Sequence, residues 1–156
     1  MDAEALIAAL DLREHPEGGW YREVFRSEVV VETARGERAA STAIYFLLVE
    51  GTFSAWHRVK SDEVWHHYAG DPVELHTLSA AGHHTIALGS DLAAGQRPQF
   101  TVERNLLQAA RVRRGWALCG CTVSPGFDFA DFKMPSREDL LAAWPASASI
   151  VRELTR

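Results

Sequence analysis

The chain has 156 residues, of which 47% are hydrophobic and 24% are charged, and its formal net charge at pH 7 is −5. A chain of this length is expected to form one domain with a sizeable buried core. The acidic balance argues against nucleic acid as a partner, because nucleic-acid binding needs a basic surface. The longest apolar run, residues 43–49, is far too short to span a bilayer. The N-terminus has neither the basic segment nor the apolar core of a signal peptide. We therefore expect a cytoplasmic protein that binds neither nucleic acid nor membranes.

Cys119 and Cys121 are the only cysteines. Two positions apart on a strand, they would point to the same face, and a disulfide between them would need unusual strain. We expect two reduced thiols in the core, and a soft-metal site is the alternative.

In chain order, residues 2–10 have apolar side chains at helical spacing and acidic residues near their start, which predicts a helix. The segment His15-Pro-Glu-Gly-Gly19 predicts a loop because of its proline and paired glycines. Short segments rich in β-branched and aromatic residues then predict strands over 20–32, 38–50, 52–58, 62–68, 72–79, 83–88, 98–103, 106–112 and 115–123. Many short strands without intervening helices indicate an antiparallel sandwich or barrel.

The last part of the chain returns to helix. Ser136, with Asp139 three residues later, predicts a helix start that resembles a capping box, and Pro145 should end that helix. A final short helix is expected at about 150–154. No repeat or linker is present, so we expect a single domain over 1–156, with a barrel core at about 20–133 and C-terminal helices within 136–155.

Alternation along the strand at 62–68 places Glu63, Trp65 and His67 on one face. Neither face of this strand is cleanly apolar. Some of these three side chains, or of Glu74 and His76 on the next strand, should therefore point into the barrel. His57 lies close by in the sequence. A small barrel can hold one small ligand among such side chains, and imidazoles and carboxylates inside a cavity suit acid–base chemistry or metal ligation.

A family resemblance follows from these residues. The pattern Gly51-x5-His57-x-Val59-x3-Glu63-x6-Gly70 resembles the first motif of the cupin superfamily, with Val59 at the position of the second histidine. Two further segments, His15-Pro-Glu-Gly-Gly-Trp-Tyr-Arg-Glu23 and the segment from Cys121 to Phe132, are similar to those of the cupin subgroup known as DUF985 or cupin_5. The resemblance covers about residues 6–133.

The resemblance implies an all-β fold, the cupin double-stranded β-helix or jelly-roll barrel, with short N-terminal and C-terminal helices. It also implies a homodimer with a polar small-molecule pocket inside the barrel. The subgroup is similar to sugar-nucleotide 3,5-epimerases, although fold alone does not supply function.

The second cupin motif falls on Val102-Glu-Arg-Asn-Leu-Leu-Gln108, where Asn105 takes the place of a turn glycine and Gln108 that of a histidine. Asparagine tolerates left-handed backbone geometry, so the turn can persist. Glutamine is a weak ligand for zinc, iron or copper. The possible metal ligands are therefore His57, Glu63 and Gln108, a degenerate set, so we predict no cofactor firmly and at most a weakly bound divalent metal.

The leading functional hypothesis is a metal-independent isomerase or epimerase acting on a sugar or a sugar-nucleotide-like substrate. His57 is the candidate general base, and Glu63 is its orienting partner or the acid. Tyr21, Tyr45 or Tyr68 could donate a proton, and Arg22 or Arg58 could hold a phosphate or carboxylate. The candidate ligand-binding residues are Tyr21, Tyr45, Ser54, Trp65 (a stacking wall), His67, Glu74 and Gln108.

Two other readings stay open. One is a barrel that binds a metabolite without turning it over, and the other is a metal-dependent dioxygenase or lyase with a degenerate site. Phe127, Phe129 and Phe132 are expected to cover the end of the barrel, and Asp128 or Asp131 could reach the pocket there.

Overall fold

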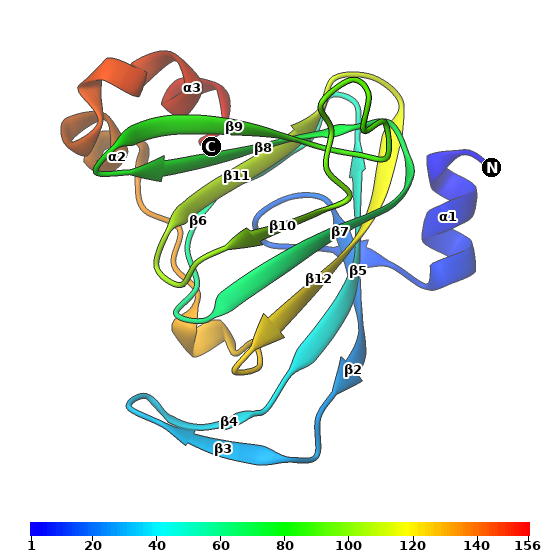
Figure 1. The fold of residues 1–156 in the computed structure, drawn as a ribbon, viewed down its shortest axis with the longest axis vertical. Coiled ribbons are helices and arrows are strands. Elements are labelled where there is room, and N and C mark those ends of the chain that lie inside the picture. Colours follow the sequence, from blue (N-terminus) through cyan, green and yellow to red (C-terminus); the bar gives the residue numbers. More distant parts are fainter.

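The computed structural model describes residues 1–156, and its main body is a pair of packed antiparallel sheets (Figure 1). The larger sheet has the strand order β1 (Arg13–Glu14), β2 (Trp20–Arg26), β5 (Thr42–Val49), β12 (Trp116–Ser124), β7 (Asp62–Gly70) and β10 (Gln99–Val102). The smaller sheet has the order β6 (Phe53–His57), β11 (Leu107–Val112), β8 (Val73–Ser79) and β9 (Gly82–Leu88). Strands distant in sequence are neighbours in both sheets, as in a jelly roll.

A separate hairpin, β3 (Val30–Thr33) and β4 (Gly36–Ala39), projects from one end of the barrel (Figure 1). The sequence predicted one strand over 20–32. The structure instead breaks this segment after Arg26, and the chain turns into the hairpin. A break of this kind was hidden because the residues on both sides of it have equally high strand propensity.

Short helices lie at both ends of the chain. Asp2 caps α1 (Ala3–Leu10) by accepting a hydrogen bond from the Ala5 N–H at 2.9 Å. Ser136 caps α2 (Arg137–Ala143) by accepting from the Asp139 N–H, which confirms the predicted helix start. The 3-10 turn η2 (Pro145–Ser147) then leads into α3 (Ala148–Glu153). None of these helices has the length and apolar character needed to cross a membrane.

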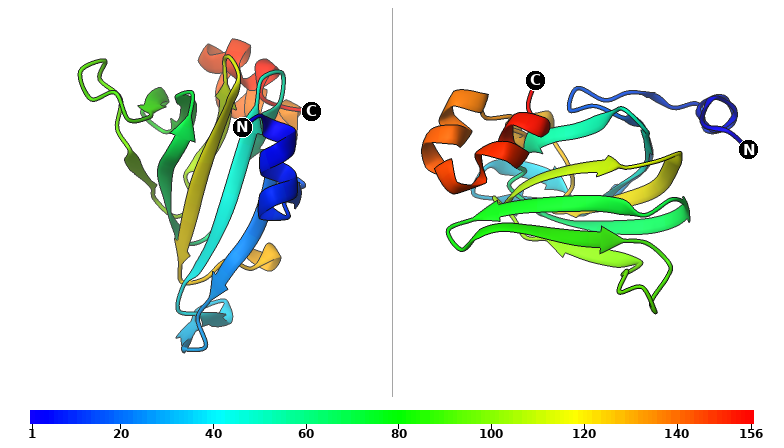
Figure 2. Two further views of the ribbon diagram at one scale, coloured as in Figure 1. Left: turned by 90° about the vertical axis from the view of Figure 1, so that its right-hand side faces the viewer. Right: turned by 90° about the horizontal axis from the view of Figure 1, so that it is seen from above.

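The molecule has two apolar cores. Figure 2 shows the C-terminal helices on one side of the sheets and α1 on the opposite side. The first lies between the sheets and is built from inward-facing residues such as Phe46, Trp65 and Leu75. The second lies between the outer face of the smaller sheet and the C-terminal helices, where Trp56 packs with Leu140, Val151 and neighbouring residues. The part of the smaller sheet that contacts these helices is therefore covered on both faces.

Two predictions about single residues are confirmed. Asn105 has φ 65°, so it does replace a glycine in a left-handed turn. Cys119 and Cys121 are free thiols buried in the core, and burial raises the pKa of Cys119 to about 12.

Candidate functional site

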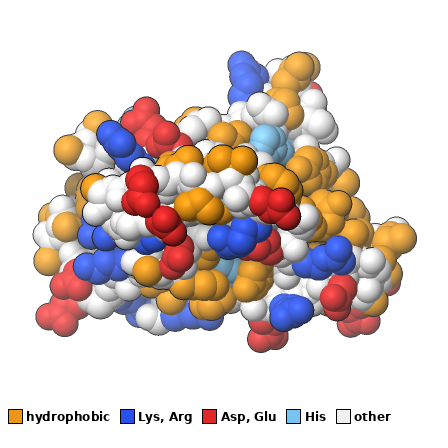
Figure 3. All heavy atoms as spheres, turned by 90° about the horizontal axis from the view of Figure 1, so that it is seen from below, with side chains coloured by type: hydrophobic (Ala, Val, Ile, Leu, Met, Phe, Trp, Pro, Cys, Tyr) orange, Lys and Arg blue, Asp and Glu red, His pale blue; other side chains and the backbone are white.

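A cavity of about 500 Å³ opens at the end of the barrel from which the β3–β4 hairpin projects. Its wall is formed by inward-facing residues of β2, β5, β6, β7 and β12, by the loop after β1 and by the segment 127–132. On this end of the molecule, hydrophobic side chains lie among side chains of both charges (Figure 3). The volume is within the range of small-molecule sites.

The loop His15–Gly19 carries Glu17 into the cavity. Its own turn is closed by hydrogen bonds between His15 and Gly19 and between Gly18 and His15, each 2.9 Å long. Gly18 has φ 109°, and a Cβ there would overlap the carbonyl oxygen of Phe53, so only glycine fits. The Glu17 carbonyl accepts a hydrogen bond from the Ala55 N–H at 2.7 Å. The loop is thereby fixed against β6, the strand that carries His57.

His57 and Glu17 form a buried ion pair. The Nε2 atom of His57 lies 3.0 Å from a carboxylate oxygen of Glu17, and Nδ1 donates to the Ala55 carbonyl at 2.7 Å. Burial opposes the imidazolium, but the charge and hydrogen bond of Glu17 outweigh it and raise the pKa of His57 to about 9. Burial likewise opposes ionisation of Glu17, and His57 outweighs it, so the pKa of Glu17 is lowered. At neutral pH the pair is an imidazolium with a carboxylate.

Glu63 faces the same cavity from β7 in a different electrostatic environment. Its carboxylate accepts a hydrogen bond from Gln108 Nε2 at 2.6 Å, and the oxygen of that amide accepts from the Trp65 indole at 2.8 Å. No cation is dedicated to Glu63, since His57 is paired with Glu17. Burial raises the pKa of Glu63 and outweighs the opposing charge of His57, and the charge of Glu17 adds to the increase. One cavity thus holds two carboxyl groups whose pKa values are displaced in opposite directions.

His15 contributes a neutral imidazole. Its Nδ1 accepts a hydrogen bond from the Glu17 N–H at 3.1 Å, so the ring proton is on Nε2. Burial lowers the pKa of His15, which keeps the ring uncharged. His15 lies in the wall of the cavity, and it gives the site an N–H donor.

Aromatic side chains form one side of the cavity. Phe127, Phe129 and Phe132 line it, and Phe132 stacks on His57 with ring centroids 5.4 Å apart. This confirms that the phenylalanines cover the end of the barrel. The 3-10 turn η1 (Phe129–Asp131) is fixed by Arg38 of the hairpin, which donates two 2.9 Å hydrogen bonds to Asp131. Asp131 therefore fixes the aromatic wall from outside the cavity, whereas Asp128 lines it.

The outer part of the wall carries charges that are mostly paired. Arg26 donates to both carboxylate oxygens of Glu23 at 2.9 and 2.8 Å and to the carbonyl of Phe127 at 3.1 Å. It is the only Arg or Lys in the wall. Arg22 and Arg58, the predicted anion-binding residues, do not line the cavity, and Arg22 donates to the Leu10 carbonyl.

The structure brings together three of the predicted site residues, namely His57, Glu63 and Tyr21. Trp65 and Gln108 lie behind the wall and hold Glu63 through the hydrogen bonds described above. Ser54 is fully buried outside the wall. The remaining candidates lie elsewhere: Tyr45 packs edge-on against the exposed Tyr68, His67 contacts the Asp71 carbonyl, and Glu74 is paired with Arg111 and Arg113.

The residues present do not fit a cupin metal centre. Val59 lines the cavity at the position of the second histidine. Both ends of the Gln108 amide are engaged, and Nε2 of His57 is directed at Glu17. No group of three or more His, Cys, Asp or Glu side chains is arranged to hold a metal ion. We therefore derive no chemistry through a metal at this site.

Glu17 was not among the predicted site residues. A carboxylate that precedes two glycines in a proline-containing loop reads as a turn, and alternation arguments apply only within strands. The one sequence feature that could have identified Glu17 is its position in the segment from His15 to Glu23, which resembles the family.

A double-stranded β-helix with a polar cavity at one end is the architecture of a cupin. The family model of the Cupin superfamily (DUF985) matches residues 4–135, and the chain belongs to this family. A protein from Shewanella oneidensis is 40% identical, with a TM-score of 0.93 and coverage of 100% of this chain and 98% of that chain. A hypothetical protein from Leishmania major is 32% identical, with a TM-score of 0.94 and coverage of 99% of both chains.

More distant structures share the fold alone. Oxalate decarboxylase from Bacillus subtilis is 14% identical with a TM-score of 0.58, and the match covers 93% of this chain and 38% of that chain. No curated protein matches the chain.

Proposed function

We propose that the protein is a metal-independent enzyme of the isomerase or epimerase class, which moves protons on a small sugar-like substrate in the cavity. The observation that carries this proposal is the pair of carboxyl groups, Glu17 and Glu63, with pKa values displaced in opposite directions within one cavity. Such pairs assign a base and an acid.

The roles follow from the directions of the two pKa shifts. Glu17, whose pKa is lowered, acts as the base and removes a proton from a carbon next to a carbonyl group. Glu63, whose pKa is raised, acts as the acid and gives its proton to the carbonyl oxygen as negative charge develops there, which yields an enediol. Return of both protons, with the carbon protonated on the other face or at the neighbouring position, gives the epimer or isomer and restores the enzyme.

His57 acts on Glu17 rather than as the base itself. With a pKa of about 9 it keeps its proton at neutral pH, and its hydrogen bond at 3.0 Å orients the carboxylate. The base role that the sequence suggested for His57 therefore passes to Glu17 in this proposal. Tyr21 and His15 supply further polar groups, and the three phenylalanines offer an apolar face to a sugar ring.

The charges of the wall favour an uncharged sugar over a sugar nucleotide. Besides the proton donor Glu63, three acidic side chains line the cavity (Glu17, Glu23 and Asp128), against two cationic ones, Arg26 and protonated His57. Both cations are paired with carboxylates. A phosphate would therefore meet no free cation and would have to displace Glu23 from Arg26.

Solvent deuterium exchange tests the proposal. Unphosphorylated ketoses and aldoses and deoxy-ketosugar nucleotides are incubated in D₂O with the wild type, with Glu17→Gln and with Glu63→Gln, and wash-in is followed by mass spectrometry. We expect wash-in with at least one uncharged sugar, lost in both variants and kept in Glu32→Gln, which changes an exposed carboxylate on β3. The proposal fails if no compound exchanges, or if both cavity variants exchange at the wild-type rate.

A barrel that only binds a metabolite remains the competing function. It is supported if a sugar raises the melting temperature of the wild type without any exchange or product, because ligand binding alone stabilises the folded state.

We also propose that the protein is a homodimer. β1 pairs only with the first two residues of β2, so the rest of β2 has an open edge. The apolar side chains of Val24, Phe25, Val29 and Val30 are exposed along and after this strand. An open edge next to exposed apolar side chains is a suitable surface for pairing with a second copy.

A further inference from the structure

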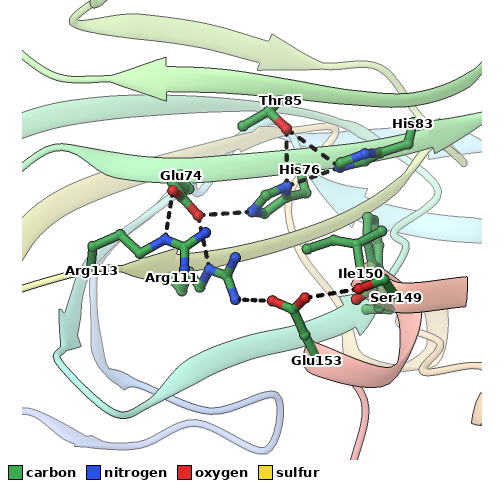
Figure 4. Close-up of polar contacts among 10 residues, drawn as sticks. Glu74, His76, His83, Thr85, Arg111, Arg113, Ser149, Ile150 and Glu153 are labelled. Atoms are coloured by element: carbon green, nitrogen blue, oxygen red, sulfur yellow. Dashed lines mark hydrogen bonds and ion pairs between the residues drawn. The ribbon is translucent and has the colours of Figure 1, made fainter. Parts of the chain in front are cut away.

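A second cluster of titratable side chains lies on the outer face of the smaller sheet, outside the cavity (Figure 4). Its members come from β8, β9, β11 and α3. In Figure 4 the side chains of His76, His83 and Thr85 point toward one another, and Glu74 lies on the far side of the His76 ring. None of these residues has a role in the function proposed above.

The three converging side chains have nearly equal separations. His76 Nδ1 lies 3.0 Å from His83 Nε2, and the Thr85 hydroxyl oxygen lies 3.3 Å from the first nitrogen and 3.4 Å from the second. A transition metal bonded to imidazole nitrogen at about 2.0–2.1 Å places neighbouring ligand atoms about 2.9–3.4 Å apart. The three atoms therefore have the spacing of one face of a coordination polyhedron.

The register of the hairpin explains this convergence. His76 on β8 lies directly opposite Thr85 on β9, and His83 is two residues from Thr85 on the same face. His84 is paired with Thr77 and belongs to the other face of β9. Two adjacent histidines thus differ in whether they can join the cluster.

The surroundings of His76 prepare its Nδ1 as a ligand. The Glu74 carboxylate lies 3.5 Å from His76 Nε2, which is buried and has no direct hydrogen bond. Glu74 is itself held by Arg111 at 2.8 Å and Arg113 at 2.7 Å. A carboxylate behind an imidazole favours the tautomer with its proton on the nearer nitrogen, so the lone pair is on Nδ1.

The cluster can be reached from solvent. His76 is buried while Thr85 is exposed, so one side of the cluster is open to water.

We propose that His76 Nδ1, His83 Nε2 and Thr85 Oγ1 form a binding site for a divalent late transition metal, with water completing the coordination. In the metal-free protein a proton lies between His76 Nδ1 and His83 Nε2, and the ion takes its place when His83 adopts the tautomer protonated on Nδ1. Imidazole ligands with open positions favour Cu²⁺ over Ni²⁺ and Zn²⁺. The bound ion links β8 to the edge strand β9 close to the C-terminal helices, with Glu74 as a positioning residue.

Calorimetric titration of the full chain with Cu²⁺, and separately with Ni²⁺ and Zn²⁺, tests the site. We expect one Cu²⁺ per chain at this site, about tenfold or more weaker binding in His83→Gln, and wild-type binding in the matched control His84→Gln. Circular dichroism establishes that each variant is folded. Equal binding by His83→Gln and the wild type would overturn the proposal, as would equal losses in both variants.

Spectroscopy separates this site from the cavity imidazoles. The electron paramagnetic resonance spectrum of the Cu²⁺ form should show coupling to two imidazole nitrogens and should persist in His57→Gln. A spectrum lost in His57→Gln but retained in His83→Gln would place the ion in the cavity and refute the site. Glu74→Gln should weaken binding about tenfold while keeping the two-nitrogen spectrum, because Glu74 acts through His76.

Discussion

The Nε2 atom of His57 on β6 lies 3.0 Å from a carboxylate oxygen of Glu17, which belongs to the loop between β1 and β2. The same loop is fixed to β6 through the Glu17 carbonyl and the Ala55 N–H. Backbone and side chain of Glu17 are thus both directed at one strand. The protonation state of the cavity depends on this attachment.

Glu17→Gln should markedly lower the pKa of His57 from its value of about 9. Burial alone favours the neutral imidazole, and the carboxylate is the main group that opposes it. Histidine titration by NMR measures the change. Glu63→Gln should lower the same pKa by a smaller amount, since Glu63 contributes only a weaker charge effect. The expectation is wrong if His57 in Glu17→Gln still titrates near 9.

The stability of the wild type should decrease as pH rises from 6.5 to about 9. The folded state holds a proton on His57 that the unfolded chain releases near 6.5, so this contribution is complete below 6.5 and lost through the folded pKa of about 9. A shift of this size corresponds to at most about 3 kcal/mol. Urea unfolding at pH 6, 7.5 and 9.5 measures it, and the difference between the wild type and His57→Gln should shrink with pH. A constant difference would contradict the ion pair.

Asp131→Asn should loosen the aromatic wall without changing a cavity residue. Asp131 is buried and accepts from Arg38 and contacts Arg35 at 3.2 Å, so its loss leaves two cations without their partner. We expect a loss of about 2–4 kcal/mol in unfolding free energy. Asp139→Asn at the start of α2 should cost about 1 kcal/mol or less. Similar losses in the two variants would show that the pairing of Asp131 with Arg38 and Arg35 adds no more to stability than an exposed carboxylate does.

Phe25→Asp should convert the proposed dimer to a monomer. Phe25 is 53% exposed on the open edge of β2, so a charge there opposes pairing of two copies without disturbing the core. Sedimentation velocity measures the change in mass. Leu92→Asp changes a 62% exposed residue in the loop between β9 and β10, away from β2, so it is the matched control and should leave the mass unchanged. A wild type that sediments as a monomer would rule out this dimer.

The fold could be predicted largely from the sequence because alternation and turn residues mark strands locally. Asn105 shows this well, since a left-handed residue could be expected from its position in the motif and the turn exists. The hairpin at Val30–Ala39 was harder to predict from the sequence, because its strands have the same kind of residues as β2.

The site could be predicted only in part. His57 and Glu63 follow from motif spacing, and both face the cavity. Trp65 is on the same face of β7 as Glu63, as expected, but it lies deeper in the barrel and does not line the cavity. Its indole N–H donates a hydrogen bond to Gln108 there. Glu17 could not be derived from strand alternation, because it reaches the site through a loop whose path depends on long-range hydrogen bonds.

Two successive residues of β6 point to opposite faces of the smaller sheet. Trp56 points outward: its indole donates a hydrogen bond to the Ile150 carbonyl, and its backbone N–H donates to the Leu154 carbonyl. His57 points inward to the cavity. Detachment of the C-terminal helices would therefore release the very strand that carries the imidazolium. The C-terminal helices and the cavity are therefore parts of one cooperative unit, and unfolding of these helices is expected to abolish activity although none of their residues lines the cavity.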